Sequence, residues 1–183
     1  PGPLARHCKN VCYMRRNEED WFSTQVFRRA ARWIQHNADH EDFFLMIDNF
    51  DPHEPWDPPR YYTDLYDDPD YDGVEFTAPH SRKVEGYMSD AEFKHSKALY
   101  AGEVTLMDRW LGYFLDQVEL MGAMDNTLIL LTTDHGTYLG DYGYMAKHST
   151  HLHRCLSQIP LIAWHPEHGH GQRRDQMIQM IDL

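Results

Sequence analysis

The chain has 183 residues, of which 42% are hydrophobic and 25% are charged, a length and composition typical of one globular domain with its own core. The formal net charge is −12, so the surface repels a phosphate backbone and a nucleic-acid partner is not expected. No apolar run approaches the roughly 18 residues of a membrane helix, and no membrane segment is predicted. Three cysteines are too few for a disulfide scaffold, whereas 13 histidines provide many possible metal ligands.

Two regular elements are predicted in the first 50 residues. Residues 18–37 place large apolar side chains at spacings of three and four, which indicates a helix with one face in the core. Residues 43–47 form a continuous apolar run, typical of a strand buried on both faces. Residues 48–90 contain most of the ten prolines and several closely spaced aspartates. This composition predicts a long irregular insert, and loops of such length are usually functional.

Helical periodicity returns at residues 90–121, and two further apolar runs follow it. Residues 127–133 and 159–164 are interpreted as buried strands, and residues 176–183 begin a helical pattern. Strands that alternate with helices predict an α/β fold with an open, mostly parallel sheet flanked by helices.

Polar residues follow two of the predicted strands, where ligands bind in α/β sheets. The sequence DPHEPW occupies residues 51–56, and Asp134, His135 and Gly136 come directly after the strand at 127–133. Asp134 and His135 offer an oxygen and a nitrogen to one cation, while Gly136 allows a sharp turn. The alternative, which the sequence leaves open, is that Asp134 caps the next helix and His135 makes an ordinary hydrogen bond.

Two further side chains are candidates for anion chemistry. His53 lies between two prolines, which restrict its backbone and hold its imidazole in place. Lys147 is the only lysine in residues 98–183 and follows a glycine-rich stretch, so its ammonium is a candidate oxyanion binder. A solvent-exposed lysine is the alternative interpretation.

The order of these motifs resembles the sulfatase family of the alkaline phosphatase superfamily. The resemblance covers about residues 18–183 and includes DPHEPW at 51–56, YAGEV at 100–104, DHG at 134–136, Lys147, and IPL at 159–161. It implies a partial alkaline-phosphatase-like fold. Residues 1–183 would then form an incomplete sulfatase-type catalytic domain with an irregular insert at about 48–90.

The resemblance also implies a role for each candidate residue. Asp134 and His135 would be ligands of a divalent cation, usually Ca²⁺ in this family, although the histidine suits Mn²⁺ or Zn²⁺ equally well. His53 and Lys147 would be catalytic, contacting the sulfate group or the leaving oxygen. His148, which adjoins Lys147, would line the substrate site. The substrate would be a small-molecule or glycan sulfate ester.

The nucleophile of the family is not found in this sequence. Sulfatases use a Cys or Ser, converted to formylglycine, in a Cys/Ser-x-Pro-x-Arg motif; Cys12 is followed by Arg16, but Met14 stands at the proline position. Cys12 is therefore interpreted as a structural thiol. We expect the formylglycine in a missing N-terminal part, so that the parent protein is the hydrolase and this fragment alone is inactive. The alternatives are a phosphonate or phosphate ester hydrolase of the same superfamily and a non-catalytic protein that binds sulfated ligands.

Overall fold

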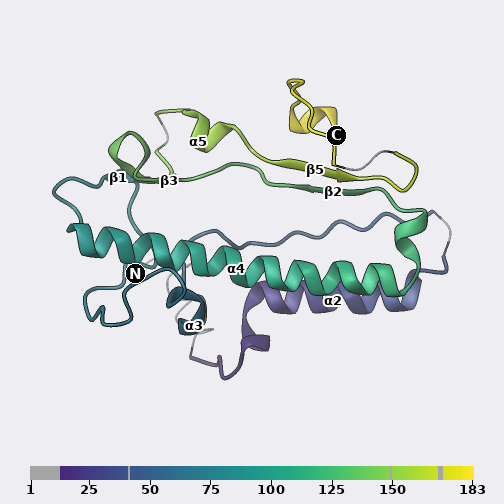
Figure 1. Cartoon of the computed structure of the whole chain (residues 1–183), viewed down its shortest axis with the longest axis horizontal. Coiled ribbons are helices and arrows are strands. Elements are labelled where there is room, and N and C mark those ends of the chain that lie inside the picture. Colours follow the sequence, from purple (N-terminus) through teal and green to yellow (C-terminus); the bar gives the residue numbers. More distant parts are fainter. Residues whose placement is uncertain (1–12, 41, 149, 169–170) are drawn as a thin grey trace.

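A computed structural model describes residues 13–40, 42–148, 150–168 and 171–183. Figure 1 shows two layers, with helices α2 (Phe22–Asn37) and α4 (Asp90–Leu120) on one side and strands β2 (Ile129–Thr132) and β5 (Leu161–Trp164) on the other. The chain is thus a mixed fold of helices and small sheets. In the described part of the chain, no helix is both long and apolar enough to cross a bilayer.

Both long helices occur where the apolar periodicity predicts them. The helix α4 begins with a capping box, in which Ser89 Oγ accepts a hydrogen bond from the Glu92 amide and the Glu92 carboxylate accepts one from the Ser89 amide. It ends before Gly122, which has a left-handed backbone conformation that favours glycine. The helices α2 and α4 pack together along an apolar seam of Phe27, Ala30, Ala31, Ile34, Phe114 and Val118.

The segment between the two helices is irregular, apart from the short helix α3 (Arg60–Thr63) and strand β1 (Arg82–Lys83). Its Trp56 side chain is completely buried in contact with the rest of the molecule. Trp56 packs in a second core cluster with Met88, Leu99 and Met145, and its ring lies edge-on to Tyr100 with centroids 5.3 Å apart. This cluster holds the segment on α4.

We expect Trp56→Ala to lower the free energy of unfolding by about 3–5 kcal/mol, because it removes a fully buried aromatic side chain and leaves a cavity. Urea unfolding of the 183-residue chain measures the change. Tyr13→Ala is the matched control, since this aromatic side chain is 92% exposed and its loss should change the free energy of unfolding by less than about 0.5 kcal/mol. Equal losses in the two variants would contradict the assignment of Trp56 to the core.

The mostly parallel sheet that the sequence predicts is not confirmed. Within the described residues every strand pair is antiparallel: β2 pairs with β5, and β4 (Tyr144–Ala146) pairs with both β1 and β3 (Tyr138–Leu139). A parallel pair needs a crossover that returns the chain to the starting edge of the sheet. Between β4 and β5 the only helix is the four-residue α5 (Arg154–Ser157), which is too short for such a crossover. The chain therefore returns alongside β2 in the opposite direction, as Figure 1 shows.

Two other predicted elements differ from the structure. Residues 43–47 are extended but pair with no strand among the described residues. The predicted helix at 176–183 is wrong except for one 3₁₀ turn, η4 (Met180–Asp182). The side chains of this segment are exposed, so its apolar face has no surface to pack against, and a short helix is marginal without such packing.

Candidate active site

The first part of the site is the 51–57 loop, which is fastened at both ends. At its beginning, the Asp51 carboxylate accepts hydrogen bonds from the amide and the hydroxyl of Ser23, at 3.2 and 2.6 Å, in the first turn of α2. Burial raises the pKa of Asp51, and these two hydrogen bonds oppose the shift. At its other end, the Trp21 indole donates to the Asp57 carbonyl at 2.8 Å. The loop is therefore held to the N-terminal end of α2.

His53 lies at the middle of this loop, where one backbone contact and two ring contacts hold it. Its amide donates to the Phe50 carbonyl at 3.0 Å, and its ring stacks on Phe50 with centroids 4.4 Å apart. The Nδ1 atom lies 2.6 Å from the Glu54 carbonyl oxygen. A carbonyl only accepts, so Nδ1 carries the hydrogen and the lone pair of a neutral ring is on Nε2.

The Lys147 side chain is the hydrogen-bond partner of this lone pair. It follows β4 directly, and its Nζ atom lies 2.5 Å from His53 Nε2 and 3.1 Å from Glu54 Oε1. The Lys147 backbone is held as well, because the Ser81 hydroxyl donates to its carbonyl oxygen. The ammonium is thus fixed between an imidazole that accepts a hydrogen bond from it and a carboxylate that balances its charge.

Asp134 and His135 come directly after β2. The Asp134 carboxylate accepts a hydrogen bond from the His135 amide at 2.9 Å, and its side chain is 83% exposed. The His135 Nδ1 atom donates to the Gly136 carbonyl at 2.8 Å, so Nε2 keeps its lone pair and lies 3.7 Å from Asp134 Oδ2. No helix directly follows Asp134 among the described residues, so Asp134 does not cap a helix, and its carboxylate instead accepts from the amide of the next residue.

Gly136 is needed for a reason other than a sharp turn. Its amide donates to the Leu156 carbonyl at 2.8 Å, and a Cβ atom placed on it would lie 2.1 Å from the Cys155 carbonyl oxygen. Only glycine allows the two backbones to approach this closely. The contact brings the α5 segment against the end of β2 and forms one wall of a pocket.

The pocket has a volume of about 420 Å³, within the range of small-molecule sites. It brings together Asp134, His135 and Lys147, and His53 is joined to it through Lys147. His148, the predicted substrate-binding neighbour of Lys147, also lines it, and the His148 Nδ1 atom is 3.0 Å from Nδ1 of His151. Polar and charged side chains share the wall with apolar ones, and the full lining is Asp134, His135, Lys147, His148, Leu152, Leu156 and Ser157.

The sequence and the fold of this chain are similar to those of known proteins. The family model described as Sulfatase matches residues 6–183. The chain belongs to the sulfatase family. An arylsulfatase of Clostridium perfringens is 29% identical over 173 residues, which cover 86% of this chain and 36% of that protein. A "multifunctional alkaline phosphatase superfamily protein" of Trinickia caryophylli is 27% identical over 189 residues, covering 88% and 36%.

A solved structure shows the same fold. It is a protein in complex with its substrate D-glucosamine-2-N,6-O-disulfate, and it superimposes with a TM-score of 0.63 at 16% identity, over 80% of this chain and 43% of that one. The sulfatase chain described here therefore spans about a third of the length of the curated relatives cited above.

A divalent cation fits the atoms that this sulfatase chain presents. Asp134 Oδ2 and His135 Nε2 are separated by 3.7 Å, and a carboxylate oxygen and an imidazole nitrogen are both atom types that bind divalent metals. Among the residues that the structure describes, no three His, Cys, Asp or Glu side chains converge as a metal site.

Two carboxylates near the site received no role from the sequence. Glu54 stands next to His53 in the motif, but its ion pair with Lys147 joins segments far apart in the sequence. Glu103 lies on α4 and accepts a hydrogen bond from the Asp57 amide at 3.1 Å. No local pattern indicates this contact. Cys12, interpreted from the sequence as a structural thiol, lies outside the described residues.

Proposed function

We propose that this chain provides the leaving-group side and part of the cation site of a sulfuric ester hydrolase. The observation that carries the proposal is the Lys147 ammonium, which is held by His53 and Glu54 at the edge of the pocket that also contains Asp134 and His135. Membership of the sulfatase family supports it.

His53 and Lys147 would serve the oxygen that leaves the sulfur. When the S–O bond of the ester breaks, its electron pair goes to the leaving oxygen, which then needs a proton. Lys147 Nζ donates one hydrogen bond to His53 Nε2 and would transfer another of its protons to the leaving oxygen, which leaves a neutral amine; the Glu54 carboxylate would keep the pair oriented. The Lys147 charge also stabilises the negative charge that develops on the sulfate oxygens.

Asp134 and His135 would hold a divalent cation, for which we propose Ca²⁺. When bound, such a cation polarises the sulfate and stabilises the charge of the transition state. The Gly136 carbonyl holds His135 in the tautomer that leaves Nε2 free to bind a metal. The printed sequence contains no Cys/Ser-x-Pro-x-Arg motif, so we place the formylglycine nucleophile outside it.

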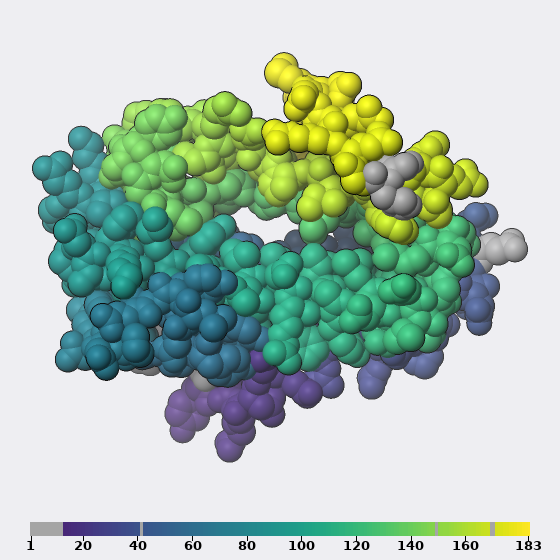
Figure 2. Space-filling model, in the orientation of Figure 1, coloured from purple at the N-terminus to yellow at the C-terminus, as the bar shows by residue number. Residues whose placement is uncertain are grey.

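We also propose that β2 and residues 43–50 belong to one mostly parallel sheet in the whole protein. Figure 1 shows residues 43–50 running in the same direction as β2, and their exposure alternates from residue to residue as in a strand. Phe43, Leu45 and Ile47 pack on the same core as Ile129 of β2. Figure 2 shows an opening between the layer that contains β2 and β5 and the layer of α4. A further strand would fill this space and pair both edges.

The proposed substrate is a sulfated sugar or another small sulfate ester, in keeping with the size of the pocket and with the disulfated glucosamine bound by the structural neighbour. A phosphonate or phosphate ester is the second candidate, because one relative is named as a multifunctional member of the alkaline phosphatase superfamily.

The test is an assay of the complete gene product that contains this chain. We expect kcat/KM for 4-nitrophenyl sulfate to exceed that for 4-nitrophenyl phosphate and for a phenyl phosphonate ester. Treatment with EDTA should abolish turnover, and added Ca²⁺ should restore it. A preference for the phosphorus esters would favour the second candidate. Binding of sulfated sugars without turnover of any ester would contradict both and identify a non-catalytic binding protein.

A further inference from the structure

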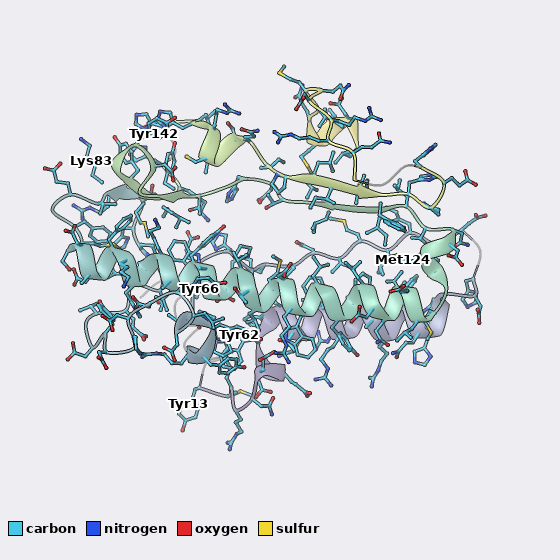
Figure 3. The ribbon with its side chains drawn as sticks, in the orientation of Figure 1. Tyr13, Tyr62, Tyr66, Lys83, Met124 and Tyr142 are labelled. Atoms are coloured by element: carbon cyan, nitrogen blue, oxygen red, sulfur yellow. The ribbon has the colours of Figure 1, made fainter. Side chains whose placement is uncertain are left out.

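Glu103 is the most deeply placed carboxyl group near the candidate site. It lies in the middle of α4 and is only 1% exposed. The preceding residue, Gly102, allows the helix to press directly on the segment at 58–63: a Cβ atom on Gly102 would be 3.0 Å from the Pro58 ring and 3.1 Å from the Thr63 amide. Figure 3 shows Tyr62 and Tyr66 on this side of α4. The packing leaves Glu103 no route to solvent.

The contact of Glu103 fixes the end of the 51–57 loop. Its Oε2 atom accepts a hydrogen bond from the Asp57 amide at 3.1 Å, next to the fully buried Trp56. The start of the same loop is held on α2 by the hydrogen bonds between Asp51 and Ser23. The stretch that carries His53 and Glu54 is thus held between the half-buried carboxylate of Asp51 and the buried carboxyl group of Glu103.

Two further carboxyl groups act on Glu103. Among the described residues, Asp51 and Asp57 from the loop and Arg15 from the segment before α2 are the charged groups that act on it. The Arg15 guanidinium is committed to Asp57, with a nitrogen–oxygen distance of 2.7 Å. Asp51 and Asp57 thus place two further carboxyl groups near Glu103, which itself has almost no access to water. Burial raises the pKa of Glu103 well above its usual range, and the negative charges of Asp51 and Asp57 add to the shift.

We propose that Glu103 is a neutral, protonated carboxylic acid at pH 7 and that it acts as the positioning residue for the loop that carries His53 and Glu54. As an acid it offers a carbonyl oxygen to the Asp57 amide through Oε2 and places its proton on the other oxygen. As an anion it would repel Asp51 and Asp57 at the two ends of the loop.

Infrared spectroscopy tests the protonation directly on the 183-residue chain. The difference spectrum of wild type minus Glu103→Gln at pH 7 should contain the carbonyl stretch of a protonated carboxylic acid, which ¹³C-labelled glutamate shifts to lower frequency. Glu119→Gln, an exposed change on the same helix, should show loss of a carboxylate band instead. A carboxylate band lost in both variants would overturn the proposal.

The pH dependence of stability provides a second test. A carboxyl group with a raised folded-state pKa binds its proton more tightly in the folded chain, so its contribution is complete below the unfolded pKa of about 4.3 and declines as the pH rises toward the folded pKa. Glu103→Gln should therefore become more stable relative to wild type between pH 4 and pH 8. Glu119→Gln should follow wild type. A difference between Glu103→Gln and wild type that is constant with pH would contradict the proposal.

The link to His53 rests on the proposed function. In the complete enzyme, Glu103→Ala should lower kcat with little change in KM, and Glu103→Gln, which keeps the acceptor for the Asp57 amide, should restore most of the rate. Failure of this rescue while the acid band is present would overturn the positioning role. Absence of sulfatase activity in wild type would instead contradict the proposed function. The infrared and stability measurements would still decide whether Glu103 is protonated.

Discussion

Replacing Asp134 by Ala is expected to remove the bound cation from the complete enzyme and to reduce sulfate ester turnover about 1,000-fold. The estimate follows from a metal contribution of several kcal/mol to the transition state, at about 1.4 kcal/mol for each factor of ten. Elemental analysis of the purified protein and kcat on 4-nitrophenyl sulfate measure the two effects. Since the Asp134 side chain is 83% exposed, the free energy of unfolding of the metal-free protein should stay within about 0.5 kcal/mol of wild type.

Asp175 provides the matched control for this prediction. It is similarly exposed and lies outside the pocket, so Asp175→Ala should keep both the metal content and the rate of wild type. Full turnover by Asp134→Ala would rule out the assigned ligand. A loss of rate with an unchanged metal content would mean that Asp134 acts in another way.

The second large effect is expected for His53 and Lys147. Alanine at either position should lower kcat/KM by about 10²- to 10⁴-fold for esters with poor leaving groups, because proton donation to the leaving oxygen is lost. For nitrophenyl esters, whose leaving group needs no proton, the loss should be far smaller. A series of aryl sulfates, plotted as log kcat/KM against the pKa of the leaving phenol, should give a steeper negative slope for both variants than for wild type.

Two outcomes distinguish the possible roles of this pair. Equal losses across the whole series would mean that His53 and Lys147 bind the ester without protonating it. The control is Ser157→Ala, which changes a polar group of the pocket wall that has no proposed part in proton transfer. This variant should keep the wild-type slope. A parallel change in its slope would show that the pocket as a whole, and not the pair, determines the response.

The two long helices could be predicted from the sequence because their determinants are local. The spacing of Phe27, Ala30 and Ile34 marks the buried face of α2 without reference to any partner, and the apolar periodicity that returns at residue 90 marks α4. The pairing of strands is not local. The apolar runs at 127–133 and 159–164 indicate two strands but not their relative direction, which depends on the path of the chain between them.

The same distinction applies to the candidate site. Asp134 and His135 are adjacent in the sequence, so their common location was predictable, and Lys147 stood out as an isolated cation. The contact between Lys147 and Glu54 depends on the packing of β4 against the 51–57 loop, which no short pattern encodes. The burial of Glu103 is of the same kind: within the helical pattern it is an ordinary polar residue, and only the loop that covers it makes it unusual.

The contact between His53 and Lys147 joins two residues that are 94 positions apart, and the 31 residues of α4 lie between them in the chain. Closing so long a loop costs chain entropy, which the packed core must offset. We therefore expect this contact to form late in folding. The His53–Lys147 contact, proposed to be catalytic, would therefore form only in a completely folded molecule. A genetic screen for lost hydrolysis should accordingly recover substitutions along the buried face of α4, far from the pocket, alongside those in the pocket itself.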